Sequence, residues 1–169
     1  GTNEVQRFLI LKDLIAQAAD WPELPERLHE RPGDNAAMLL ARKKNTLRTH
    51  CLAAASRFGD TAWSDAMLQP ALFPLAEMAG EICRLEAIIY RREWIEAHAE
   101  KLGADYVGPM IEAGMRAADR SLAKLDDREE KFRQAWKTLA ADMTMPEVRA
   151  ADSALDLFAE GTAPHTDAV

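Results

Sequence analysis

The chain has 169 residues, of which 48% are hydrophobic and 29% charged, a globular composition with enough length for one domain and a sizeable core. The formal net charge of −7 argues against a general affinity for nucleic acid or anionic membranes, because both need clustered Lys and Arg. Two cysteines, Cys51 and Cys83, cannot build a disulfide framework or a thiolate zinc site. The longest apolar run near the N-terminus, residues 8–11, is too short for a signal peptide core or a membrane span. We therefore expect a soluble, cytoplasmic protein.

Residue usage favours helices throughout the chain. Alanine occurs 31 times and the strand-favouring valine four times, so an all-α fold is expected. Apolar residues at helical spacing predict a first helix over residues 4–19. The next segment, residues 20–34, contains three prolines and one glycine, which indicates a connector with one helical turn over residues 26–30.

A second helix is predicted from Asp34 or Asn35, either of which can cap it, to Gly59. Its apolar stripe consists of Leu40, Leu47, Cys51, Ala54 and Phe58. These positions repeat at the three-, four- and seven-residue spacing of one buried helix face.

The most informative predicted element is a long helix over residues 75–102, ended by Gly103. Its first apolar stripe consists of Leu75, Met78, Ile82, Leu85 and Ile89. A second stripe, nearly opposite, recurs every seven residues and consists of Ile88, Ile95 and Leu102. Since a surface helix needs only one stripe, we expect this helix either to lie centrally among its neighbours or to give one face to a partner chain.

Three further helices are predicted, over residues 106–125, 127–143 and 146–159. Asp126 or Asp127 would cap the second of them. The last residues, 161–169, are small and polar and are expected to form a flexible tail. The expected architecture is one all-α domain over residues 1–160, a compact bundle of five or six helices around one long central helix.

Residues 50–56 place a leucine and a run of small residues after a histidine. This arrangement resembles the phosphoacceptor helix of histidine phosphotransfer domains, although Ala53 stands where that family has a lysine. The resemblance implies a four-helix bundle in which His50 accepts a phosphoryl group from a receiver domain. On a helical wheel, His50 lies about 80° from the centre of the apolar stripe. The favoured interpretation is therefore a partly exposed histidine at the edge of the core, with phosphotransfer as the alternative.

Four cations on the second helix are candidate contacts to nucleic acid: Arg42, Lys43, Lys44 and Arg48. They spread around the helix instead of lining one side, so a helical DNA-associated regulator is a second alternative. Glu26 and His29 have the spacing of a di-iron ligand pair, but no second such pair exists in the sequence. No metal site, cofactor or catalytic constellation is expected.

The second stripe of the long helix leads to the main functional hypothesis. Cationic residues beside it give an apolar seam with polar edges, as is typical of surfaces where helices pair. The predicted partner-binding residues are Ile88, Ile95, Leu102, Arg84 and Arg91. We expect a non-enzymatic protein interaction or assembly module, with a homodimer through the long helix as the specific hypothesis.

Overall fold

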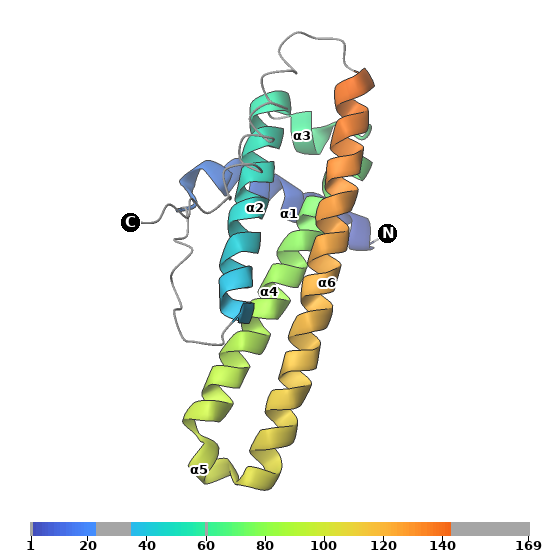
Figure 1. Ribbon diagram of the computed structural model, residues 1–169. Helices are drawn as coiled ribbons and strands as arrows, with labels where there is room; N and C mark the ends of the chain where they lie inside the picture. The colour runs from blue at the N-terminus through green and yellow to red at the C-terminus, as the bar shows by residue number, and fades with distance from the viewer. Residues whose placement is uncertain (1, 23–34, 60, 143–169) are drawn as a thin grey trace, which may run out of the picture.

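A computed structural model of the chain describes residues 2–22, 35–59 and 61–142, and every regular element in these ranges is helical (Figure 1). The elements are α1 (Thr2–Gln17), η1 (Ala18–Asp20), α2 (Asn35–Phe58), α3 (Thr61–Ser64), α4 (Gln69–Ala97), α5 (Ala99–Leu102) and α6 (Ala104–Asp142). The long helix α4 contacts α1, α2, α3 and α6. The expected all-α bundle around one central helix is confirmed.

The first predicted stripe of α4 forms the centre of the core. All five of its residues are buried, and Leu75 and Leu85 are completely enclosed. They share one cluster with Leu11 of α1, Leu47 of α2 and Phe132 of α6. Burial of these apolar side chains, each contributing roughly 1.5–3 kcal/mol, is what holds the helices together.

Both ends of α4 differ from the prediction of one helix over residues 75–102. α4 ends at Ala97, and the short α5 follows after His98. The helix begins at Gln69, with Pro70 in its first two positions and Pro74 inside it. Proline is tolerated in a first turn, where the backbone N–H has no intrahelical acceptor. This accounts for Pro70; Pro74 lies one turn further in, where the helix continues without one of its backbone hydrogen bonds.

The prediction of separate helices over residues 106–125 and 127–143 is wrong, because α6 is continuous from Ala104 to Asp142. The acidic pair that was expected to cap a new helix lies in its middle. Asp127 forms an ion pair with Lys131, one turn further on, at 2.8 Å. Leu125 and Phe132, on either side of this pair, are both fully buried. The apolar face thus continues through the acidic segment and keeps it helical.

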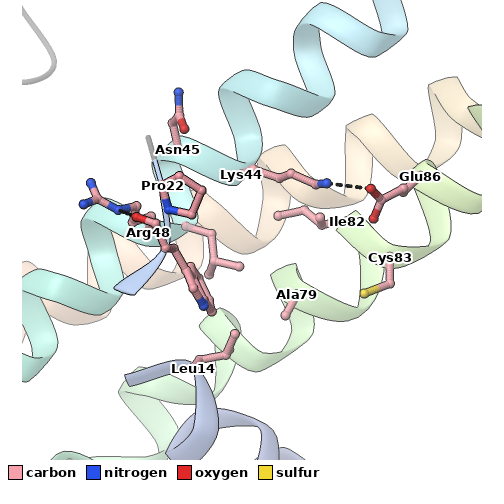
Figure 2. Close-up of a pocket in the computed structure, with 11 residues that line it drawn as sticks. Leu14, Pro22, Lys44, Asn45, Arg48, Ala79, Ile82, Cys83 and Glu86 are labelled. Carbon is pink, nitrogen blue, oxygen red and sulfur yellow. Dashed lines mark hydrogen bonds and ion pairs between the residues drawn. The ribbon is translucent and has the colours of Figure 1, made fainter. Parts of the chain in front are cut away.

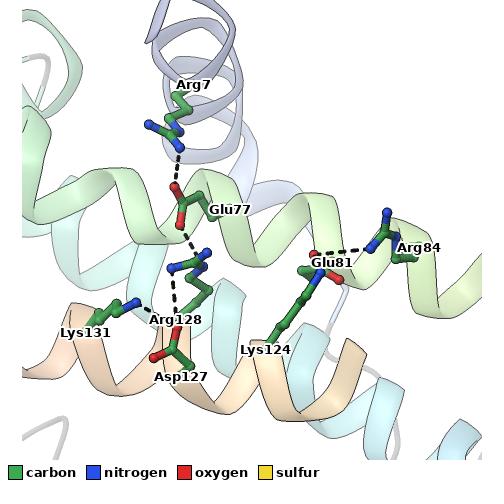
Figure 3. A network of polar contacts seen from close by, with 8 residues as sticks. All are labelled: Arg7, Glu77, Glu81, Arg84, Lys124, Asp127, Arg128 and Lys131. Atoms are coloured by element: carbon green, nitrogen blue, oxygen red, sulfur yellow. Dashed lines mark hydrogen bonds and ion pairs between the residues drawn. The ribbon is translucent and has the colours of Figure 1, made fainter. Parts of the chain in front are cut away.

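A polar network joins three helices on one side of the core (Figure 3). Glu77 of α4 accepts from Arg7 of α1 and from Arg128 of α6, each at 2.7 Å. Glu81, one turn further along α4, lies 3.4 Å from Lys124 of α6. These contacts link α1, α4 and α6, and their order along the two long helices shows that α4 and α6 run antiparallel.

The second helix ends as predicted. α2 stops at Phe58, and Gly59 follows with a positive φ of 52°, a conformation that glycine adopts without strain. The predicted turn over 26–30, the helix over 146–159 and the tail over 161–169 lie outside the described residues.

The far halves of α4 and α6 extend past α1 and α2 as a pair of helices, with α5 at the tip (Figure 1). We call this pair the arm. In the described ranges, none of the helices has the combination of length and apolar character that a membrane span requires.

Candidate partner-binding surface

The apolar residues of the predicted seam turn toward α6. Ile95 is only 3% exposed, and Ile88 and Leu102 are partly buried. Glu81 contacts Lys124 of α6. Ile88 and Ile95 follow Glu81 by one and two seven-residue repeats, so all three side chains lie on the side of α4 that faces α6. Ile95 is therefore buried within this chain, and the neighbour that covers it is α6.

A different face of α4 is exposed. Its residues follow one another at spacings of four, three, four and three: Cys83, Ala87, Tyr90, Trp94 and Ala97. We call this set the α4 stripe. Tyr90 is 71% exposed and Trp94 is 49% exposed, although large aromatic side chains are buried on average. Alternating spacings of three and four are those of helices that pair.

Charged residues flank the α4 stripe on both sides. Arg84 and Arg91, predicted as partner-binding residues, are exposed on one side. Glu86 and Glu93 lie on the other side, toward α2. Tyr90 and Trp94 were not predicted as site residues. The sequence signal that could have identified them is the alternation of four- and three-residue spacings that begins at Cys83 and Ala87.

The aromatic end of the α4 stripe is held in place by His98. The rings of Trp94 and His98 stack with centroids 4.5 Å apart and an interplanar angle of 22°. His98 Nδ1 also lies 2.8 Å from the Trp94 carbonyl oxygen, at hydrogen-bond distance. α4 ends at this point, where His98 leaves helical geometry. The indole is thus presented at the surface in a fixed orientation.

A cavity of about 330 Å³ adjoins the other end of the α4 stripe, between α1, α2 and α4 (Figure 2). Cys83 is part of its wall. Its apolar lining includes Leu14, Trp21, Leu47, Ala79 and Ile82. Two cations of α2 also line it: Lys44 Nζ lies 2.6 Å from Glu86, and Arg48 Nε donates to the Trp21 carbonyl at 2.7 Å. Glu86 lines the cavity as well, so the charge of Lys44 is balanced there, and the cavity is an apolar depression with a polar edge toward α2.

The four cations predicted as nucleic-acid contacts are largely engaged within the chain. Lys43 Nζ lies 2.6 Å from both Asp126 and Glu129 of α6. Burial lowers the pKa of Lys43, but the bonds to these two carboxylates outweigh it and the pKa is raised. Lys44 and Arg48 line the cavity, and Arg42 is exposed. This distribution does not build a patch of unpaired positive charge for phosphates.

His50 lies inside the core, so the expectation of a partly exposed residue at its edge is wrong. The side chain is 4% exposed, and its ring centroid is 4.6 Å from that of Phe132. Neither ring nitrogen has a hydrogen-bond partner in the described residues. Burial lowers the pKa of His50 from 6.5 to about 4. The reason is α6, which covers this side of α2, and a receiver domain could not reach the imidazole in this arrangement.

The two cysteines differ in a way that can be measured. Cys51 is buried, and burial raises the pKa of its thiol to about 12, whereas Cys83 is exposed. We expect one thiol per chain to react with a disulfide reagent in the native protein and two in denaturant, because only an accessible thiolate reacts. The absorbance of the thiol that the reagent releases gives the number of cysteines that have reacted. Two fast-reacting thiols in the native state would contradict the packing of α2.

Metal binding finds no support in the part of the chain that the structure describes, where no three His, Cys, Asp or Glu side chains gather as ligands. Searches of family models, curated proteins and solved structures give no match to this chain.

Proposed function

We propose that the protein is a non-enzymatic interaction or assembly module that binds a protein partner through the α4 stripe. The exposure of Tyr90 and Trp94 on one helix face carries this proposal. Aromatic residues are enriched among those that dominate binding energy at protein interfaces. Adjacent exposed apolar side chains also favour association with another surface.

The arm suits this role. It extends beyond α1 and α2 (Figure 1), so a partner can approach α4 without displacing the core helices. Both cysteines are free, which fits a reducing compartment such as the cytoplasm. The buried position of His50 and the intramolecular contacts of Lys43 favour an interaction module over phosphotransfer or nucleic-acid binding.

A photo-crosslinking experiment tests the proposal. A benzophenone amino acid is placed at Tyr90 in the full chain, and the protein is illuminated in the cells that make it. We expect a covalent product with a protein, because a partner on the α4 stripe lies against this position. The matched control is the same substitution at Met67, which is 83% exposed and lies outside the stripe. Absence of any product at Tyr90, or equal products at both sites, would contradict the proposed function.

A further inference from the structure

We infer that the cavity between α1, α2 and α4 is a binding site for a small, uncharged aromatic molecule of two or three rings. This goes beyond the proposed function, because the ligand lies between the helices and needs no protein partner on the α4 stripe. Three properties of the cavity support it: the apolar lining, the internal pairing of its polar groups, and its size.

The lining of the cavity is mostly apolar (Figure 2). Three helices contribute aliphatic side chains to it: Leu14 from α1, Leu47 from α2, and Ala79 and Ile82 from α4. Pro22 adds an apolar ring that brings no backbone N–H with it. Water in such a space finds few hydrogen-bond partners, so an apolar molecule that displaces this water binds favourably.

The polar groups at the edge of the cavity already have partners in its own wall. Lys44 Nζ lies 2.6 Å from Glu86, which joins α2 to α4, and Arg48 Nε donates to the Trp21 carbonyl at 2.7 Å. A charged ligand would have to leave water and compete with these contacts, which is costly in an apolar space. The cavity therefore favours an uncharged ligand.

The size of the cavity and one of its side chains indicate aromatic rings. Its volume is about 330 Å³, roughly twice the 150 Å³ of an engineered apolar cavity that binds benzene, and in the range of ligand pockets. Trp21 belongs to the lining, and its indole can make offset or edge contacts with the rings of a ligand. Two rings fit inside, and a third can extend toward the opening.

The cavity is accessible without separation of the helices. Cys83 lines it and is exposed. The side chains of Lys44 and Glu86 are 30% and 54% exposed, so the edge between α2 and α4 faces solvent. The bond from Arg48 holds the Trp21 backbone in the wall while the cavity is empty. A ligand thus meets a site that is already formed, which lowers the entropic cost of binding.

A fluorescence titration of the purified full chain tests the chemistry of the ligand. The probe is N-phenyl-1-naphthylamine, an uncharged fluorophore of three rings. We expect one saturable site per chain with a Kd of about 10 μM or tighter. The matched control is 8-anilinonaphthalene-1-sulfonate, which has the same rings and one sulfonate, and its Kd should be at least about 10-fold higher. Equal or tighter binding of the sulfonate would overturn the preference for an uncharged ligand.

The location is tested by filling the cavity. Ala79→Phe puts a ring into the space that the probe needs, so the Kd for the uncharged probe should rise by about 10-fold or more. Ala97→Phe is the matched control, because Ala97 is exposed on the same helix and does not line the cavity. Its Kd should equal that of the wild type, and circular dichroism verifies that both variants are folded.

A second measurement uses the natural sequence and so decides the location even if Ala79→Phe does not fold. The uncharged probe at saturation should slow the reaction of Cys83 with a disulfide reagent by about fivefold or more, because the bound rings cover a thiol in the cavity wall. Ala97→Cys adds an exposed thiol outside the cavity as an internal control. The rate at this added thiol should not change.

The outcomes separate this inference from the proposed function. Absence of saturable binding by the uncharged probe overturns the cavity as a ligand site and leaves a crosslinked partner at Tyr90 unaffected. Binding that neither slows Cys83 nor weakens in Ala79→Phe overturns it as well, because the probe then lies elsewhere. Binding in the cavity without any crosslinked protein at Tyr90 supports the ligand site and contradicts only the interaction function.

Discussion

Replacing Trp136 by alanine is expected to lower the free energy of unfolding by about 3–5 kcal/mol. The indole is 3% exposed, and its ring centroid lies 5.5 Å from that of Phe132 and 5.8 Å from that of Phe58. The guanidinium of Arg57 lies 4.9 Å from the same ring. Truncation would leave a void between α2 and α6 that two packed helices cannot close. A urea titration followed by helical circular dichroism measures the loss.

Met115→Ala provides the control for this substitution, because Met115 lies on the same helix and is 56% exposed. Its effect should stay below about 1 kcal/mol, as is usual for exposed positions. A loss that small for Trp136→Ala would mean that the indole does not pack between α2 and α6, and that this end of the core is arranged differently.

Acid should destabilise the protein between pH 6.5 and about 4 through His50. Burial holds the pKa of His50 at about 4 in the folded chain, against 6.5 without burial. Glu129 raises this pKa, whereas Arg133 and Lys43 lower it further. The unfolded chain therefore binds a proton more readily than the folded one, so this contribution to stability is complete above pH 6.5 and is lost as the pH falls. A shift of this size corresponds to about 3 kcal/mol in total, of which about 2 kcal/mol is lost by pH 5.

His50→Leu isolates this contribution from that of the carboxylates, which also weaken the fold in acid. Leucine has no titrating group and no ring nitrogens to leave without partners in the core. The variant should be at least as stable as the wild type at pH 5, and its stability should depend less on pH between 7 and 5. Urea titrations at both pH values measure the difference. Equal pH dependence in the two proteins would show that the imidazole is not buried in its neutral form.

Helical periodicity was sufficient to predict α2 and the buried face of α4. Leu40, Leu47 and Cys51 repeat on one side of α2, and all three are buried as that pattern requires. The same reasoning wrongly predicted a break in the middle of α6, because Asp126 and Asp127 are residue types that often begin a helix. Their actual partners, Lys43 on another helix and Lys131 one turn later, could be recognised only with the packing in view.

The candidate site was predictable in part. Two apolar faces on the long helix were visible in the sequence, but which face meets α6 depends on tertiary structure. Ile88 and Ile95 looked like the open seam because they recur every seven residues, whereas Tyr90 and Trp94 lie on the side that α6 leaves uncovered. The burial of His50 could not be predicted from its own helix either. Phe132, which lies against its ring, is more than 80 residues away in the chain.

The shape of α4 and α6 has a consequence for cooperativity. At 39 residues, α6 is about 58 Å long, and one half packs into the core while the other half forms the arm. Buried side chains of α4 and α6 are concentrated in the core half, and the arm contributes few, Ile95 among them. Local opening therefore costs least at the tip and rises toward the core. Tyr90 and Trp94 lie on the part of this helix pair that opens most easily. A partner that binds there would therefore reduce fraying where the core contributes least to stability.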